Sequence, residues 1–284
     1  MKKTALPLLL SAILLLTACG TSAPAATSEQ TSATTTPTPS TEATTVAETT
    51  IPQPTLPPNT SGKVEIRVIS NSMTYPYNSY LITSSNGDTI VIDPTDMPKP
   101  EKLQIDPILI TSTHNHPDHV DSVFMDSHDC EKILYEEADV TVGDFHVYTI
   151  PSSHSNNVIN TPANNYIIVY EIDGLRIAHM GDIGQETLTD DQLEKLGEID
   201  IAFMQFENGY SNMDLINDKG FKLMEQLNPK IVIPTHHSQV GVKEMEKRYG
   251  EVITMNDLLT IAKEDLPEDT LNYYVIENTY LYKK

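Results

Sequence analysis

Apolar runs separated by polar turns predict a series of β-strands from residue 64 onward. The runs SYLITSS (79–85) and TIVID (89–93) are joined through Asn86-Gly87, a pair typical of a β-hairpin turn. A second hairpin is predicted within 165–180, where Asp173-Gly174 joins two apolar runs. Further strands are expected at 64–70, 108–111, 144–150, 199–204 and 230–234, and a closing strand or pair at 271–282.

Apolar residues at helical spacing predict three helices, at 188–196, 219–227 and 255–263. The hairpins come first along the chain, and the later strands alternate with helices. This order predicts an α/β fold in which two sheets carry helices on their outer faces. The sequence shows no internal repeat of fixed short period.

The first 18 residues read as an export signal. Lys2 and Lys3 precede an apolar run that is short for a membrane span. The run ends in LTAC (16–19), which resembles the lipobox of bacterial lipoproteins. The resemblance implies cleavage before Cys19, a lipid on its thiol, and anchorage on the extracytoplasmic side of the cell membrane. The alternative is a transmembrane anchor followed by an incidental cysteine.

Residues 19–61 have the composition of a disordered tether. Between Thr21 and Thr60 there are fourteen threonines and seven prolines, and no basic residue occurs between Lys3 and Lys63. Such a segment has too few apolar side chains to offset its chain entropy, and its prolines make it semi-extended. It serves as a plain or a glycosylated spacer. Residues 62–284 are then long enough to form one substantial domain.

Charge and cysteine content narrow the choice of partners. The net charge is −22, whereas nucleic acids are bound largely through lysine and arginine, so a nucleic-acid partner is disfavoured. Besides Cys19, the only cysteine is Cys130, which excludes a disulfide framework. Cys130 is expected to be a packed or idle thiol rather than a nucleophile. The sequence does not indicate an oligomeric state.

The densest chemical signal is THNHPDH (113–119), which holds three of the nine histidines. His114 and His116 stand two positions apart after a predicted strand, so their side chains should leave the same side. Asp118 is expected to cap a helix beginning at His119, so this second pair should point away from the first. Four ligands divided in this way suit two cations, which hydrolytic sites hold about 3.5 to 4 Å apart.

Three further ligand candidates each follow a predicted strand. They are His154, Asp182 within Gly-Asp-Ile-Gly (181–184), and His236. His154 could instead be an ordinary surface-loop histidine, Asp182 a turn residue, and His237 competes with His236 for one role. Imidazole and carboxylate ligands suit zinc, and also iron or manganese.

The motifs His114-x-His116-x-Asp118-His119, a later lone His154, Gly181-Asp182 and Ile233-Pro234-Thr235-His236 resemble, in this order, the metal motifs of the metallo-β-lactamase superfamily. Within it, the chain is most similar to the branch of ascorbate-6-phosphate lactonase-like hydrolases. The resemblance covers roughly residue 62 to the C-terminus. It implies an αββα four-layer sandwich with the site at one edge, in agreement with the layers predicted from the strand and helix pattern.

The resemblance also implies a ligand set. One metal would take His114, His116 and His154; the other would take Asp118, His119 and His236; and Asp182 would bridge them. A hydroxide held between the metals would attack a carbonyl or phosphoryl centre, and Asp118 would additionally handle a proton as the catalytic residue.

Residues that would determine the substrate are less evident. Asn208, Tyr210 and Asn212 follow a buried strand where related enzymes place substrate contacts, and His237 could line the pocket. The stretch FENGY (206–210) replaces the glycine-rich segment expected of the lactonase branch, which weakens any transfer of that substrate. Tyr75 and Tyr77 are either pocket or packing residues. Among the remaining histidines, His128, His146 and His179 match no ligand position, and His179 would be a core or outer-shell residue.

These observations lead to one functional hypothesis with alternatives. The chain is predicted to be a membrane-tethered, dinuclear metal-dependent hydrolase acting on a small ester, lactone or phosphodiester. The alternatives are a non-catalytic metal- or ligand-binding surface lipoprotein on the same fold, a β-lactamase, or a nuclease. The acidic composition counts against the nuclease.

Overall fold

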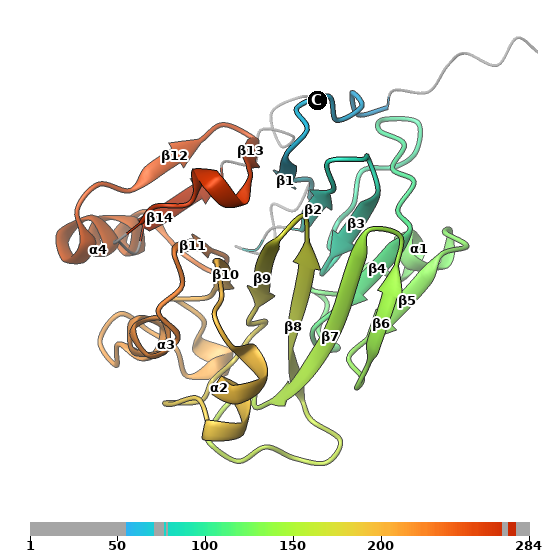
Figure 1. Cartoon of the computed structure of the whole chain (residues 1–284). Helices are drawn as coiled ribbons and strands as arrows, with labels where there is room; N and C mark the ends of the chain where they lie inside the picture. The colour runs from blue at the N-terminus through green and yellow to red at the C-terminus, as the bar shows by residue number, and fades with distance from the viewer. Residues whose placement is uncertain (1–54, 71–76, 78, 269–271, 277–284) are drawn as a thin grey trace, which may run out of the picture. The chain divides into compact units, whose positions relative to one another are not determined.

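Two β-sheets packed face to face form the centre of the structure (Figure 1). The structure is a computed structural model that describes residues 55–70, 77, 79–268 and 272–276. These residues lie in one compact unit. No helix among them is long and apolar enough to span a membrane.

The first sheet has six strands in the order β13-β1-β2-β3-β4-β5. Strands β13, β1, β2 and β3 pair antiparallel, and β3, β4 and β5 pair parallel. The strands span β1 (Val64–Val68), β2 (Tyr80–Thr83), β3 (Thr89–Ile92), β4 (Leu109–Ser112), β5 (Glu131–Leu134) and β13 (Leu258–Ile261).

The second sheet has eight strands in the order β12-β14-β11-β10-β9-β8-β7-β6. Pairing is antiparallel from β6 to β9 and parallel from β9 to β12. The strands span β6 (Asp139–Val142), β7 (Phe145–Ser152), β8 (Asn165–Ile172), β9 (Leu175–His179), β10 (Ile201–Met204), β11 (Ile231–Pro234), β12 (Ile253–Met255) and β14 (Asn272–Ile276). Strands β7, β9, β10 and β11 therefore run in one direction and end at the same edge of the sheet.

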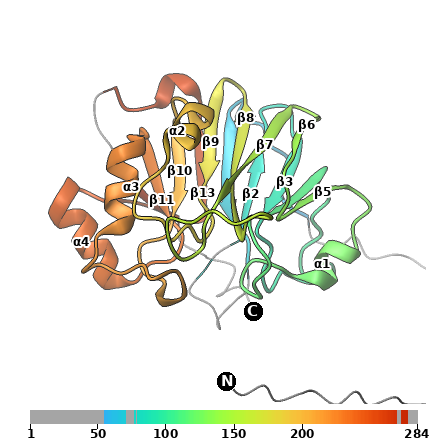
Figure 2. The same cartoon turned by 90° about the horizontal axis from the view of Figure 1, so that it is seen from below.

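Helices cover the outer faces of the two sheets. Figure 2 shows three of them beside β9, β10 and β11, and the fourth on the opposite side of the sandwich. The helices are α1 (Ser122–Asp126), α2 (Asp190–Leu196), α3 (Lys219–Leu227) and α4 (Gln239–Tyr249), and two short 3₁₀ turns are η1 (Gly209–Ser211) and η2 (Lys263–Asp265). The predicted αββα arrangement is confirmed.

Three apolar layers hold these elements together. The central layer lies between the sheets and includes Ile66, Tyr170 and Phe203. A second layer joins the outer face of the eight-stranded sheet to α2, α3 and α4, and a third joins the other sheet to α1. Burial of these side chains supplies most of the driving force for folding.

Both predicted hairpins are confirmed, as β2–β3 and β8–β9. The predicted helices at 188–196 and 219–227 are also present, as α2 and α3. Thr189 caps α2 in a capping box with Gln192, which satisfies free amide groups at the start of that helix.

The helix predicted at 255–263 is wrong, because this stretch contains the last residue of β12 and the whole of β13. Its apolar residues fit a helical spacing, but Leu259 and Ile261 alternate with outward residues in β13. Strand β13 pairs antiparallel with β1, so backbone hydrogen bonding across the sheet overrides the local pattern. Sequence reasoning also missed β5, β6 and α4.

Two further boundaries differ from expectation. The helix after the histidine loop begins at Ser122, with Asp121 as its N-cap, and not at His119 with Asp118 as cap. Contacts with the sandwich also begin before residue 62, since the side chain of Asn59 donates to the backbone of Lys63 and Ser84. The predicted export signal at 1–18 and the tether up to residue 54 lie outside the described residues.

Candidate metal centre

Seven side chains from four loops converge at one edge of the sandwich. The loop after β4 carries four of them, and the loops after β7, β9 and β11 carry one each. They are His114, His116, Asp118, His119, His154, Asp182 and His236, and they fall into two groups whose ligand atoms lie within 4.8 Å of one another. Loops at strand ends are held by a rigid sheet, which fixes these positions.

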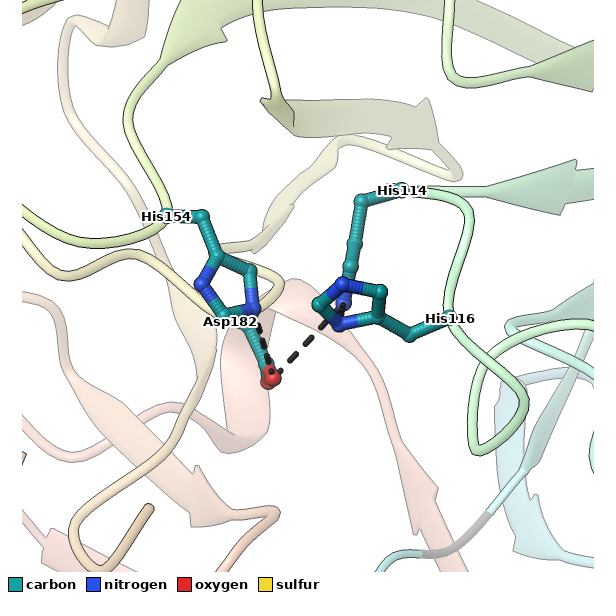
Figure 3. A group of neighbouring side chains, drawn as sticks. All are labelled: His114, His116, His154 and Asp182. Atoms are coloured by element: carbon teal, nitrogen blue, oxygen red, sulfur yellow. Dashed lines mark hydrogen bonds and ion pairs between the residues drawn. The ribbon is translucent and has the colours of Figure 1, made fainter. Parts of the chain in front are cut away.

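The first ligand group is His114, His116, His154 and Asp182 (Figure 3). The Asp182 Oδ2 atom lies 3.6 Å from His114 Nε2 and 3.4 Å from His154 Nε2. His114 Nε2 is also 3.1 Å from His116 Nδ1. His116 is exposed, so this group opens toward solvent.

The second ligand group is Asp118, His119, Asp182 and His236. Asp182 Oδ1 lies 3.4 Å from His119 Nε2 and 3.3 Å from His236 Nε2. Asp118 Oδ2 is 3.8 Å from each of these two nitrogens. Asp182 therefore turns one oxygen to each group. The two pairs of the histidine loop lie in different groups, although Asp118 does not cap the following helix.

Buried ligand atoms without hydrogen-bond partners show that a cation fits here. Within the described part of the chain, the fully buried side-chain atoms that lack a partner include His119 Nε2, His154 Nε2, His236 Nε2 and Asp182 Oδ1. Leaving a buried polar atom unpaired costs about 1 to 3 kcal/mol each. Four such atoms aimed at one another are accounted for by ions that they would share.

The protonation of the ligand side chains also favours a bound cation. Burial by itself raises the pKa of Asp182, but His119, His154 and His236 together outweigh this and hold that pKa well below its usual range. Burial lowers the pKa of His114 and of His116, which favours neutral imidazoles with lone pairs to donate. For His119, burial lowers the pKa, yet Asp182 and Asp93 raise it to about 10. The carboxylates thus draw positive charge into the site.

Asp93 fixes the ring of His119 from behind. Its Oδ2 atom accepts hydrogen bonds from His119 Nδ1 at 2.8 Å and from the Thr113 hydroxyl at 2.8 Å. Its Oδ1 atom accepts from the Thr113 amide at 2.7 Å. With Nδ1 of His119 donating to Asp93, Nε2 is the nitrogen that faces the second ligand group, and it would bind a cation in place of its proton. Sequence reasoning missed Asp93, because an aspartate at a strand end is common.

Glycines flanking Asp182 allow backbone segments to approach closely. Gly181 has φ +57°, and a Cβ there would overlap the side chains of Asn165 and Thr113. A Cβ on Gly184 would overlap the backbone of His154. The two glycines therefore let the Asp182 loop pack against the neighbouring ligand loops.

The expected substrate-binding residues occupy different environments. Asn208 is buried, and its side-chain Nδ2 donates to Asp182 Oδ2 at 2.6 Å, so the amide is already engaged. Tyr210 is 89% exposed. His237 lies outside both ligand groups, and its Nδ1 contacts the Thr235 carbonyl oxygen. The structure therefore places His236, and not His237, among the metal-site residues.

The other histidines and Cys130 lie apart from the ligand groups. His179 is buried beside Asp93, whereas His146 forms a surface cluster with Asp139 and Glu171. His128 contacts the backbone of Phe124 and Ile105. Cys130 is a free, half-buried thiol packed near the third apolar layer, as expected of a packed thiol. Tyr75 lies outside the described residues.

The sequence profile described as "Beta-lactamase superfamily domain" matches residues 74–236, more than half of the chain. The match includes all seven side chains of the two ligand groups. The chain therefore belongs to the β-lactamase superfamily.

Two solved structures are similar to this chain. A protein from Thermotoga maritima, provisionally described as a Zn-dependent hydrolase of the metallo-β-lactamase superfamily, is 20% identical with a TM-score of 0.55. The alignment covers 75% of this chain and 100% of that one. YhfI of Bacillus subtilis, a metallo-β-lactamase fold protein, is 12% identical with a TM-score of 0.49, covering 76% and 97% of the two chains. No curated protein shows significant similarity to the sequence.

Proposed function

We propose that this chain is a dinuclear metal-dependent hydrolase acting on a small ester, lactone or phosphodiester. Its cofactors would be two divalent cations, with zinc favoured over manganese or iron. Histidine nitrogens and carboxylate oxygens suit all three metals. Superfamily membership and the zinc-dependent description of the Thermotoga protein support the zinc assignment.

The observation that carries the proposal is the shared Asp182 carboxylate between two complete ligand groups. Each group contains four donors within 4.8 Å of one another, and the donors contributed by Asp182 face both groups. A protein that only bound one ion would not need a second set of buried, unpartnered nitrogens. Two cations held in this way would lower the pKa of a bound water and polarise a carbonyl or phosphoryl oxygen.

The chain's own residues supply orientation and proton handling. His114, His154 and Asp182 are buried, so their positions are fixed before substrate arrives. Asp118 has the most accessible carboxylate of the two groups, with a side chain 19% exposed against 2% for Asp182. We assign Asp118 the exchange of a proton with the reacting group, at its Oδ2 atom.

The substrate range rests on the motif resemblance and on the open side of the site at His116. The lactone comes from the likeness to lactonase-like enzymes, and esters and phosphodiesters share its electrophilic centre. Tyr210, exposed two residues beyond Asn208, is proposed to contact the substrate, with Asn208 and His237 lining the site behind it. A nucleic-acid substrate remains disfavoured by the net charge of −22.

The cellular position is a separate proposal. The LTAC motif (16–19) and the threonine- and proline-rich spacer support a lipid anchor at Cys19 and an extracytoplasmic site. Cys19→Ala should abolish the anchor, and detergent phase partitioning of cell extracts would detect its loss. A Cys19→Ala protein that still enters the detergent phase would contradict this position.

Metal content and hydrolysis together test the main proposal. The purified full chain should hold two metal equivalents by elemental analysis. It should hydrolyse at least one of p-nitrophenyl acetate, a γ-lactone, bis(p-nitrophenyl) phosphate and a chromogenic β-lactam. His116→Ala should lose one metal equivalent, and Asp118→Ala should lower hydrolysis by at least about a hundredfold. Stripping the metal with a chelator should abolish turnover, and adding zinc or manganese should restore it.

His146→Ala provides the matched control, because it removes a histidine that lies in neither ligand group. It should keep both metal equivalents and full hydrolysis. A wild-type protein without bound metal, or hydrolysis that survives both His116→Ala and chelation, would defeat the proposal. Two bound metals without turnover of any substrate class would favour a non-catalytic binding protein.

A further inference from the structure

Tyr77 and His179 form a buried link between the two loops that carry most of the metal ligands. Neither side chain belongs to a ligand group, and both are almost fully buried. Tyr77 precedes β2, and His179 is the last residue of β9, three positions before Asp182. Both contact the outer-shell residue Asp93, so they extend the network that begins at His119.

The hydrogen bonds of this link have a defined direction. The Gly181 amide donates to His179 Nδ1 at 3.1 Å, which makes His179 Nε2 the protonated nitrogen. That nitrogen lies 2.9 Å from the Tyr77 hydroxyl and donates to it. The hydroxyl in turn donates to Asp93 Oδ2 at 3.1 Å, the same atom that receives His119 Nδ1.

The protonation states agree with this direction. Burial lowers the pKa of His179 to about 4, so its ring is neutral at neutral pH and carries one proton. The single proton of the Tyr77 hydroxyl is the one donated to Asp93. Every member of the chain of hydrogen bonds therefore has one role and cannot readily reverse it.

The rings add a second set of contacts. The Tyr77 ring centroid lies 4.2 Å from that of His119 and 4.9 Å from that of His236. These are the two histidines of the second ligand group. His179 stacks on Phe203 of β10, with ring centroids 5.3 Å apart, which holds the other end of the link on the sheet. No ring contact or hydrogen bond recorded within the described residues joins Tyr77 to the histidines of the first group.

We infer that Tyr77 and His179 are positioning residues that set the geometry of the second ligand group and couple it to the Asp182 loop. One arm runs from His179 through Tyr77 and Asp93 to His119. The other arm runs from His179 through the Gly181 amide to the neighbouring Asp182. The inference rests on the proposed metal site, but it concerns metal affinity and is independent of the substrate.

Tyr77→Phe tests the first arm, since it removes the hydroxyl and keeps the ring against His119 and His236. Outer-shell partners of metal ligands typically contribute 10- to 100-fold in metal affinity. We expect affinity for one of two equivalents to fall about tenfold, measured by competition with a chelator. This should be the equivalent that His236→Ala abolishes. The absorption bands of the cobalt-substituted protein should change for that equivalent alone.

Tyr170→Phe is the matched control, because Tyr170 is also buried and, within the described part of the chain, its hydroxyl is hydrogen-bonded to the Thr111 hydroxyl at 2.7 Å and to no residue of the ligand groups. This variant also loses a buried phenol oxygen, but one that contacts no metal-ligand side chain. Its thermal stability should fall, but both metal affinities and the cobalt spectrum should match those of the wild type. An equal loss of metal affinity in this control would overturn the inference.

Two substitutions at His179 test the two hydrogen-bond arms separately. His179→Asn places an oxygen near the position of Nδ1, so it keeps the acceptor for the Gly181 amide and loses the donor to Tyr77. It should reproduce the effect of Tyr77→Phe, and the double variant should be no worse than either single one. His179→Gln places an amide near Nε2 and loses the acceptor for Gly181. Because Asp182 faces both groups, this variant should weaken both equivalents.

The outcomes distinguish this inference from the proposed function. A wild-type protein that binds no metal would defeat the proposed function itself. A wild-type protein that binds two equivalents, with Tyr77→Phe unchanged in both affinities and in its cobalt spectrum, would defeat only the inference. Equal weakening of both equivalents by Tyr77→Phe would also defeat it. Thermal unfolding of each variant confirms that the comparison is made on folded protein.

Discussion

The Asn208 side chain donates its amide to the Asp182 carboxylate, with Nδ2 2.6 Å from Oδ2. The other side-chain atom, Oδ1, accepts from the Tyr210 amide at 3.0 Å, so the Asn208 side chain is held at both ends. Oδ2 of Asp182 is also the oxygen that faces His114 and His154. Asn208 therefore orients the one carboxylate on which both ligand groups depend.

Replacing Asn208 by leucine should weaken metal binding. The leucine keeps a similar volume but leaves Asp182 without its amide donor, and outer-shell losses of this kind cost about 10- to 100-fold in affinity. Competition with a chelator measures the change. Tyr210→Ala serves as the neighbouring control, because its exposed ring contributes nothing to the ligand groups. It should change KM for a substrate while leaving metal affinity intact. Wild-type affinity in Asn208→Leu would contradict an orienting role.

Gly181→Ala should destabilise the protein by about 2 to 4 kcal/mol, because it combines a strained backbone with steric overlap. The residue has φ +57°, and an added Cβ would lie 2.8 Å from Thr113 Cβ and closer still to Asn165 Oδ1. Urea unfolding measures the loss. Gly209→Ala is the matched control, since a Cβ there would meet open space. Equal stability of the two variants would show that the close approach at Gly181 does not matter.

Glu207 anchors the start of α4 and, with it, the loop that carries His236. Its carboxylate accepts from the Ser238 amide at 2.6 Å and from the Ser238 hydroxyl at 2.9 Å. Ser238 is the N-cap of that helix. Glu207→Ala should lower the free energy of unfolding by about 1 to 2 kcal/mol, since the cap loses its partner and the helix dipole its negative charge.

Chemical denaturation of Glu207→Ala and of Glu246→Ala separates this role from a general charge effect. Glu246 is an exposed residue of the same helix, away from the cap. Its replacement should change stability by less than about 0.5 kcal/mol. Similar losses in the two variants would show that Glu207 acts only through the net charge.

The surface cluster around His146 should make stability depend on pH. The hydrogen bonds that His146 donates to Glu171 and Asp139 raise the pKa of His146 in the folded protein, and the bond from His146 lowers the pKa of Glu171. The histidine contribution is present below its unfolded pKa, near 6.5, and is lost as pH rises through the raised folded value. The Glu171 contribution is present above its unfolded pKa and is lost at lower pH.

His146→Gln should therefore destabilise the protein most near pH 5 to 6, and hardly at all well above neutral pH. The His146 side chain is 39% exposed, so solvent screening limits the effect to about 0.5 to 1 kcal/mol. Urea unfolding of wild type and variant at pH 5.5 and 8.5 measures it, and taking the difference removes contributions from the metal-site histidines. A difference that grows with rising pH would contradict the assignment.

The metal-site residues could be predicted from sequence because their chemical types, their spacing and their order along the chain act together. The two-residue spacing of His114 and His116 predicts that their side chains leave the same side, and both lie in the first ligand group. Asp93 could not be predicted in the same way. It becomes recognisable only when the sandwich brings the end of β3 against the ring of His119.

Contacts between segments distant in sequence explain the other differences between prediction and structure. The stretch 255–263 satisfies a helical spacing and a strand alternation equally well, and its pairing with β1 decides between them. Asn208 was expected to face a substrate because it follows a buried strand. The strand ends beside Asp182, so the carboxylate is the partner that the amide reaches first.

The pairing of β13 with β1 also determines when the domain can be completed. Ile66 stands opposite Leu259 in the register of these two strands, so residues from opposite ends of the described chain share one sheet edge. During synthesis, β1 is translated early. Its edge that pairs with β13 stays unpaired until residues 258–261 have been translated. Uncovered strand edges recruit other chains. A chain that stops short of β13 should therefore accumulate as aggregates, and not as a smaller folded domain.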